Sequence, residues 1–213
     1  MTVLRVRYQT YEFDDIDIHI RSLRSKQEFV DTFGVAEAMG ISSAQWSLFG
    51  VVWDSSKMLA NEMKDFDFKG KRILEVGCGL ALASLLLNHQ KADITATDYH
   101  PEAAGFLTEN IRLNQAKTIP FLQANWLDEY DALGKFDVVI GSDVLYERQH
   151  VAQLCQFIER HANPACEVIL VDPGRKSHAA FSKHMIALDY VHTQRRLEVD
   201  KFKGWVLNYC RSA

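Results

Sequence analysis

The segment EVGCGLAL, residues 75–82, has the residue types of a loop that holds a nucleoside ligand against the backbone. Glycine permits a tight turn and close approach of a ligand, and a helix that starts after the loop offers unpaired N–H groups. Asp98 follows Gly79 by 19 residues, at a place where a carboxylate can accept hydrogen bonds from both ribose hydroxyls. Each feature alone suits an ordinary strand-to-helix turn or a helix N-cap, but together they indicate a nucleoside site.

Two residues of this segment distinguish between possible nucleoside ligands. A dinucleotide site uses the pattern G-x-G-x-x-G/A, whose last small residue gives access to the pyrophosphate, but Leu82 occupies that position here. Glu75, two residues before the first glycine, is a poor neighbour for a pyrophosphate and a good one for a cationic group. The segment therefore favours S-adenosylmethionine, which carries ribose, adenine and a positively charged amino-acid end, over a dinucleotide.

A second pair of residues that could do chemistry, Asp143 and Tyr146, follows the apolar run FDVVIGS. Ligands bind at the carboxyl ends of parallel strands, so these side chains are expected at the same sheet edge as the glycine loop. A carboxylate and a phenol at this place suit the orientation of an amine. From the residues alone, a helix cap for Asp143 and a surface aromatic for Tyr146 are slightly favoured.

Four further residues near these motifs have less distinctive surroundings. Arg175, in the segment DPGR after the fifth strand, suits either an acidic substrate segment or an ordinary solvated loop. Cys78 is expected to be a small packing residue, because no histidine is placed to activate its thiol. His100 and His150 flank motif positions and are expected to be surface histidines and not bases.

The elements that position these residues follow from the pattern of apolar runs. From Lys71 onward, short apolar runs alternate with helical stretches, which is typical of a parallel sheet covered by helices on both faces. Residues 190–199 and 204–211 lie too close together for a helical crossover, so they are expected to form an antiparallel hairpin that turns at 200–204. The predicted fold is α/β, a Rossmann-like doubly wound sheet of seven strands, five of them parallel.

A small α+β extension is expected before this sheet. The first 20 residues alternate in polarity and predict two short strands or a hairpin. Residues 26–39 place apolar side chains at helical spacing and are followed by Gly40, which predicts a helix that stops there. A second helix is expected from about Ser55 to Met63.

Composition limits the classes to which the chain can belong. It has 213 residues, 47% hydrophobic and 24% charged, with a formal charge of −4, which argues against disorder and against binding nucleic acid or membranes through bulk charge. The four cysteines form no C-x-x-C pair and the eight histidines no H-x-x-x-H motif, so no metal site is expected. Reduced thiols and the lack of an apolar leader predict a cytoplasmic protein.

Three motifs resemble those of the seven-strand class I methyltransferases, and within them methyltransferase family 16, the lysine-methyltransferase-like proteins. ILEVGCGLALASL is similar to the family's cofactor loop, with Ala81 in place of the usual third glycine; TATDYHPE is similar to the second-strand motif; and GSDVLYE is similar to the D-x-x-Y motif that distinguishes this branch. The similarity runs from about Trp46 to Arg211. It implies that Asp98 holds the ribose and that Tyr99 lies near the adenine.

Two tryptophans also match the family. Trp53 resembles the tryptophan before the cofactor domain, although Asp54 replaces the usual proline, and Trp126 resembles the one that flanks the adenine pocket. From the residues alone, both would equally suit core filling. The resemblance implies catalytic roles for Asp143 and Tyr146, and contacts with S-adenosylmethionine for Trp53, Glu75, Gly77, Gly79, Ala81, Asp98, Tyr99, Asn125, Trp126 and Ser142.

The resemblance implies a methyltransferase domain over residues 46–213, with residues 1–45 as an extension packed on it. Its activity would be methyl transfer to an amine nitrogen, foremost a lysine side chain of a protein substrate. Two alternatives remain open: methylation of a small amine or heterocycle, because the cofactor half carries no information on the acceptor, and a noncatalytic nucleoside-binding module. No nucleic-acid or membrane partner is expected, and the sequence leaves the oligomeric state open.

Overall fold

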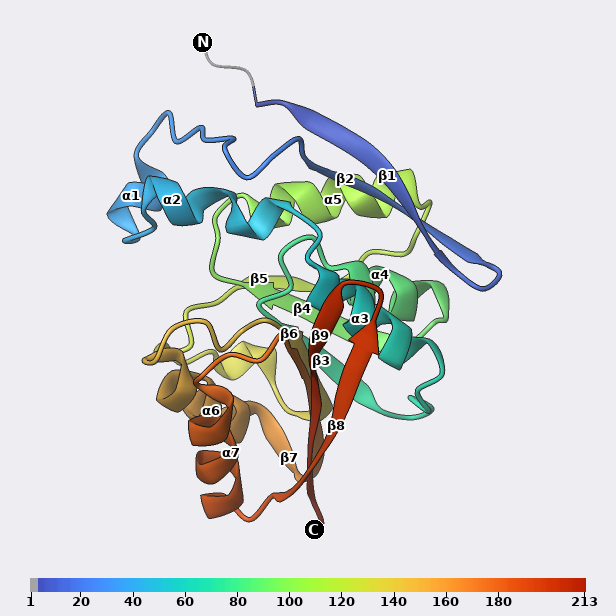
Figure 1. Ribbon diagram of the computed structural model, residues 1–213, viewed down its shortest axis with the longest axis vertical. Helices are drawn as coiled ribbons and strands as arrows, with labels where there is room; N and C mark the ends of the chain where they lie inside the picture. Colours follow the sequence, from blue (N-terminus) through green and yellow to red (C-terminus); the bar gives the residue numbers. More distant parts are fainter. Residues whose placement is uncertain (1–3) are drawn as a thin grey trace.

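The computed structural model describes residues 4–213 and contains a seven-stranded sheet covered by helices, with a separate two-stranded hairpin (Figure 1). Five neighbouring strands are parallel. The last two form an antiparallel pair, and the inner strand of this pair is also antiparallel to the parallel strand beside it. This arrangement confirms the predicted fold. In spatial order the strands are β5 (Phe121–Gln123), β4 (Asp93–Asp98), β3 (Arg72–Val76), β6 (Phe136–Ser142), β7 (Ala162–Asp172), β9 (Phe202–Arg211) and β8 (Val191–Val199).

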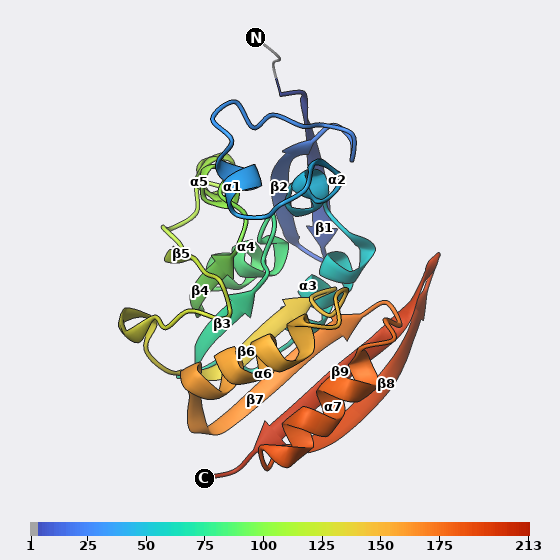
Figure 2. The same cartoon turned by 90° about the vertical axis from the view of Figure 1, so that its left-hand side faces the viewer.

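Two apolar layers hold the helices against the sheet. One layer contains residues of α3 (Asp54–Lys64), α4 (Leu82–His89) and α5 (Ala103–Leu113), and the other contains residues of α6 (His150–His161) and α7 (His178–Ala187). Figure 2 shows α6 and α7 together on one face. The side chains of β3 alternate between the layers, since Ile73 belongs to the first and Leu74 and Val76 to the second. This period of two is the pattern of a strand buried on both faces.

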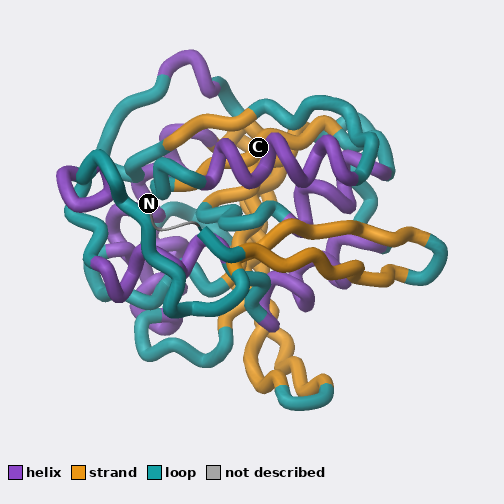
Figure 3. The backbone as a smooth tube through the Cα atoms, turned by 90° about the horizontal axis from the view of Figure 1, so that it is seen from above, coloured by secondary structure: helices purple, strands orange, loops and turns teal. Residues whose placement is uncertain are grey.

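The predicted N-terminal hairpin is present as β1 (Val6–Phe13) and β2 (Ile16–Leu23), paired antiparallel. It is attached to α5 through backbone groups of β2. The Arg21 N–H donates to Oδ1 of Asn110 at 2.7 Å, and the His19 N–H donates to Oδ1 of Asn114 at 2.8 Å. Seen from above, the turns of the β1–β2 and β8–β9 hairpins extend beyond the helices (Figure 3).

The helix predicted over residues 26–39 is wrong except for its last turn, α1 (Val35–Ala38). Gly34, immediately before α1, has a left-handed φ of 66°, which a continuous helix cannot contain. Phe29 packs edge-on against Trp46, whereas Phe33 is 89% exposed, so the apolar residues do not form one buried face. After Gly40, whose φ is 79°, the chain continues through the short elements α2 (Ser43–Trp46) and η1 (Ser47–Gly50) to α3.

Smaller elements complete the description. The helix predicted from about Ser55 to Met63 is present as α3, and a further short turn is η2 (Asp131–Leu133). The C-terminal hairpin turns at Asp200 and Lys201, and Gly204, predicted to lie in the turn, is part of β9. A Cβ at Gly204 would lie 2.5 Å from the backbone oxygen of Asp172, which explains the glycine within a strand. Within residues 4–213, no helix is both long and apolar enough to span a bilayer.

Candidate functional site

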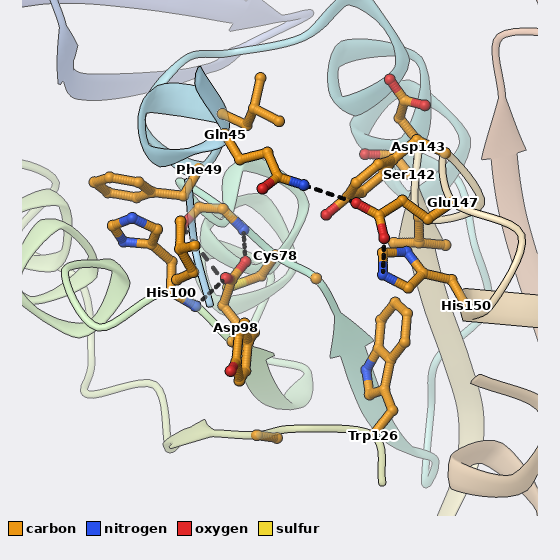
Figure 4. Close-up of a pocket in the computed structure, with 18 of the residues that line it drawn as sticks. Gln45, Phe49, Cys78, Asp98, His100, Trp126, Ser142, Asp143, Glu147 and His150 are labelled. Atoms are coloured by element: carbon orange, nitrogen blue, oxygen red, sulfur yellow. Dashed lines mark hydrogen bonds and ion pairs between the residues drawn. The ribbon is translucent and has the colours of Figure 1, made fainter. Parts of the chain in front are cut away.

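A cavity of about 650 Å³ lies at the carboxyl ends of the parallel strands. Its walls come from the loops after β3, β4, β5, β6 and β7 and from the segment between Met39 and Trp53. Figure 4 shows Asp98 and His100 on one side, with Asp143, Glu147 and His150 on the other. Of the residues predicted from the sequence, those that line it are Trp53, Gly77, Gly79, Ala81, Asp98, Tyr99, Asn125, Trp126, Ser142, Asp143 and Tyr146.

The glycine loop has the backbone conformation that its sequence suggests. Gly77 and Gly79 have φ values of 59° and 54°, in the left-handed region that glycine adopts without steric cost. A Cβ at Gly79 would lie 2.9 Å from the backbone oxygen of Phe49, so glycine is also required by packing. Ala81 has a φ of 58° and is fully buried, and it therefore bears strain that the glycine usual in the family would avoid.

Asp98, at the end of β4, is hydrogen-bonded both to the glycine loop after β3 and to the loop after β4. Its Oδ2 accepts a hydrogen bond from the Gly79 N–H at 2.7 Å, and its Oδ1 accepts one from the His100 N–H at 2.8 Å. Burial raises the pKa of Asp98, and the backbone N–H groups oppose this rise. An ionised carboxylate has about four acceptor positions, so Asp98 retains acceptor capacity toward the cavity. These acceptor positions suit the two hydroxyls of a ribose, which donate hydrogen bonds, and thus the nucleoside of S-adenosylmethionine.

Three aromatic side chains that line the cavity are fixed by their polar atoms or neighbours. The Tyr99 hydroxyl donates to the backbone oxygen of Met39 at 2.5 Å, and Trp53 Nε1 donates to that of Leu48 at 2.9 Å. The Trp126 ring lies edge-on to His150 with a centroid separation of 5.3 Å. Flat apolar surfaces of this kind suit a purine ring.

Glu75 does not line the cavity. Because β3 alternates between the two layers, its side chain points to α4, where it accepts hydrogen bonds from the backbone N–H and the hydroxyl of Ser84. It is 2% exposed, and burial raises its pKa to about 7. The predicted direct contact with the cofactor is thus corrected to a contact with the helix that follows the glycine loop.

Asp143 is paired with Arg175. Both carboxylate oxygens accept hydrogen bonds, from Nε at 2.7 Å and from Nη2 at 2.8 Å, and the carboxylate raises the pKa of the arginine. The backbone of Asp143 has a left-handed φ of 52°, and its N–H donates to the oxygen of Val171 at 2.9 Å. Strained residues of this kind are concentrated at functional sites.

Tyr146 is half-exposed at the same end of the cavity. Its ring lies edge-on to His150 with centroids 4.8 Å apart. Burial, together with the negative charges of Asp98 and Glu147, raises the pKa of Tyr146 to about 12. At pH 7 it is therefore a neutral phenol that can donate a hydrogen bond and accept one.

The expectation that His100 and His150 are surface residues is wrong. His100 is 5% exposed and stacks on Phe49 with ring centroids 3.9 Å apart; burial lowers its pKa to about 4. His150 lines the cavity between the rings of Trp126 and Tyr146, and burial lowers its pKa as well. Cys78 is buried, which raises the pKa of its thiol and agrees with a packing role.

Sequence reasoning missed Gln45, Phe49 and Glu147, which also line the cavity. Gln45 lies before Trp46, where the similarity recognised in the sequence begins, and the S-x-x-Q capping box that it forms with Ser42 marks only the start of a helix. Glu147 directly follows the D-x-x-Y motif, so its place in the chain was a usable signal. The apolar Phe49 is indistinguishable in sequence from a core residue.

Comparison with protein families gives one match that covers most of the chain. A family model described as lysine methyltransferase matches residues 39–189. The zebrafish (Danio rerio) protein N-lysine methyltransferase METTL21A is 31% identical over 140 residues, which are 61% of this chain and 63% of the relative. EEF1A lysine methyltransferase 3 of Xenopus tropicalis is 27% identical over 132 residues, 60% of this chain and 58% of the relative. The matched regions are thus less than two thirds of the length of these curated relatives.

Solved structures agree with this fold. The magnesium protoporphyrin IX methyltransferase of Synechocystis PCC 6803, crystallised with S-adenosylmethionine (SAM), superposes with a TM-score of 0.61 at 17% identity and covers 74% of this chain and 78% of that one. At this identity the similarity establishes the shared fold.

Proposed function

Because the chain belongs to the lysine methyltransferase family, we propose that it transfers a methyl group from S-adenosylmethionine to the side-chain amine of a lysine in a protein substrate. One observation carries the proposal: a single cavity contains both the Asp98–Gly79 pair and the residues Asp143 and Tyr146. When bound, S-adenosylmethionine supplies a methyl group activated by the sulfonium charge.

At the nucleoside end, the chain's task is binding and orientation. Asp98 accepts hydrogen bonds from the ribose, while the left-handed backbone at Gly77 and Gly79 lets the ligand approach the loop. Tyr99 and Trp126, which line the cavity, flank the adenine. Such positioning is the main contribution an enzyme makes to an in-line displacement.

At the acceptor end, the residues bind the charged lysine and orient its nitrogen after it has lost a proton. A lysine amine has a reference pKa near 10.4, so only about one in a few thousand is neutral at pH 7. Asp143 holds the incoming ammonium group by its charge. The ammonium then releases one proton to solvent at the exposed end of the cavity, and the neutral Tyr146 hydroxyl orients the nitrogen that attacks the methyl group. An oriented dipole of this kind stabilises the transition state without rearrangement.

Two features favour a protein acceptor over a small amine. The relatives that match the chain carry names of protein-lysine methyltransferases. Tyr146 is 49% exposed and the Arg175 side chain 43% exposed, so the acceptor end can be reached by a side chain presented from a larger surface.

We further propose that residues 46–213 are the methyltransferase unit and that the segment before them completes its cavity, since Met39, Ile41 and Gln45 line it. A cytoplasmic location is proposed as well. All four cysteines are free thiols, which a reducing compartment maintains.

The direct test is incubation of the purified chain with isotope-labelled S-adenosylmethionine and a lysate of the cells that express it. Label in protein, dependent on the chain, supports the proposal. Label in small molecules alone would assign the acceptor to the amine or heterocycle class. Tight binding of S-adenosylhomocysteine without any transfer would identify a noncatalytic binding module.

A further inference from the structure

Asp143, the carboxylate at the acceptor end, is already paired with a cation of its own chain. The two hydrogen bonds from Arg175, at 2.7 and 2.8 Å, form the bidentate arrangement that makes arginine–carboxylate pairs strong. A lysine ammonium that approaches Asp143 therefore meets a charge that is already balanced. To bind there, it must displace Arg175 or share the carboxylate with it.

The loop after β7 holds Arg175 in position but leaves its side chain accessible. Asp172, buried at the end of β7, accepts hydrogen bonds from the N–H groups of Gly174 and Arg175 at 2.8 and 2.6 Å. The Arg175 side chain is nevertheless 43% exposed, compared with 12% for Asp143. The guanidinium thus faces Asp143 and is also open to the outside, where a second carboxylate can reach it.

We propose that Arg175 binds a carboxylate of the protein substrate beside the target lysine, and that Asp143, released by this exchange, receives the lysine side chain. The inference rests on the proposed methylation of protein lysine. The exchange replaces one ion pair with two, so neither Asp143 nor Arg175 is left without a partner; an unpaired charge in a partly buried site is unfavourable. The substrate class is therefore a lysine with an Asp or Glu within contact distance.

The same arrangement disfavours other substrates. A lysine surrounded by further basic residues brings positive charge toward Arg175 and its exposed neighbour Lys176, and the substrate supplies no carboxylate to compensate for it. A lysine without charged neighbours must share Asp143 with Arg175 or leave Arg175 unpaired. Selectivity of this kind comes from penalties on the wrong partner as much as from contacts with the right one.

The test begins with wild-type protein, labelled S-adenosylmethionine and lysate of the cells that express the chain. Methylated lysines are located by mass spectrometry, and the Asp or Glu beside one of them is replaced by Asn or Gln in the isolated substrate. With wild-type protein, we expect kcat/KM for the altered substrate to fall about 10- to 100-fold, the value of a charge-assisted hydrogen bond. With Arg175→Gln, original and altered substrates should react at nearly equal rates.

Two further variants check the assignment. Arg175→Lys keeps the charge but not the bidentate geometry, and should restore part of the preference for the acidic neighbour. Arg112→Gln removes an arginine that makes a similar bidentate pair with Glu109, on α5 and outside the cavity lining. This control should keep the full preference. Binding of S-adenosylhomocysteine confirms that each variant is folded.

The outcomes separate this inference from the proposed function. Methylated lysines with no neighbouring Asp or Glu would overturn the inference and leave methyl transfer to protein intact. Equal methylation of the original and altered substrates by wild-type protein would also overturn the inference and leave methyl transfer to protein intact. This result can be obtained without an Arg175 variant. If no protein is labelled at all, both proposals are wrong.

Discussion

Gln45 and Glu147, which are 102 positions apart in the sequence, are joined by a hydrogen bond of 2.8 Å from Nε2 of the glutamine to Oε1 of the glutamate. Both residues line the cavity (Figure 4). The bond connects the segment before the seven-stranded sheet to the loop after β6, which carries Asp143 and Tyr146. The N-terminal part of the chain therefore contributes directly to the wall of the site.

Loss of this hydrogen bond should make the two segments that it connects more mobile. We expect Gln45→Ala to speed the release of S-adenosylhomocysteine about 2- to 10-fold, the range for one net hydrogen bond, as measured by stopped-flow fluorescence. Gln194→Ala, at an exposed position of β8, is the control and should leave the rate unchanged. Equal rates for wild type and Gln45→Ala would show that the bond does not retain the ligand.

Asp98→Ala should weaken S-adenosylhomocysteine binding by about 1 to 3 kcal/mol, because charge-assisted hydrogen bonds to the ribose are lost. Titration calorimetry measures this change. Asp93→Ala, at the exposed start of the same strand, serves as the control and should bind normally. Unchanged affinity of Asp98→Ala would remove this residue from the nucleoside site.

Tyr146→Phe keeps the ring and removes only the hydroxyl. If the hydroxyl orients the acceptor amine, turnover should fall about 10- to 1000-fold while S-adenosylhomocysteine affinity stays nearly constant. Steady-state kinetics with a methylated substrate and calorimetry give the two values, with Tyr8→Phe on β1 as the control. An equal loss of affinity and activity would place Tyr146 in the cofactor pocket instead.

His100 should make stability depend on pH. Its pKa is lowered by burial from 6.5 to about 4 in the folded chain, so between these values the unfolded chain binds more protons. The stabilisation is complete above about pH 6.5 and is lost as the pH falls toward about 4. We expect the melting temperature of His100→Phe to fall less than that of wild type between pH 7.5 and 5. His89→Phe, at an exposed position, should show the same fall in melting temperature as wild type. If all three proteins show the same change of melting temperature with pH, His100 is not the source of the pH dependence.

Regular features of the sequence predicted the sheet and the edge of it at which the cavity lies. Alternation of apolar runs with helices specifies buried parallel strands, and strand ends then bring the glycine loop, Asp98 and Asp143 to one edge. Glu75 could not be placed without knowing which face of β3 it occupies. That choice depends on packing against α4 and is invisible in a run of apolar residues.

The rest of the site depends on contacts between distant segments. The side chain of Gln45 reaches Glu147, and Arg175 reaches Asp143 across 32 positions; no local pattern encodes such pairs. His100 is buried because Phe49, from the short 3-10 helix η1, stacks on it. The helix predicted over residues 26–39 is absent apart from its last turn for two reasons: the left-handed backbone at Gly34, which is local, and the packing of Phe29 on Trp46, which is a contact between segments.

The most direct test of the central claim is to find the atom that receives the methyl group. The purified chain is incubated with S-adenosylmethionine carrying a deuterated methyl group and with lysate protein, and the labelled peptides are sequenced by tandem mass spectrometry. The account predicts deuterated methyl groups on lysine side-chain nitrogens, absent when the chain is omitted and strongly reduced with Tyr146→Phe. Label confined to another residue type or to small molecules, or the same lysine label without the chain, would contradict it.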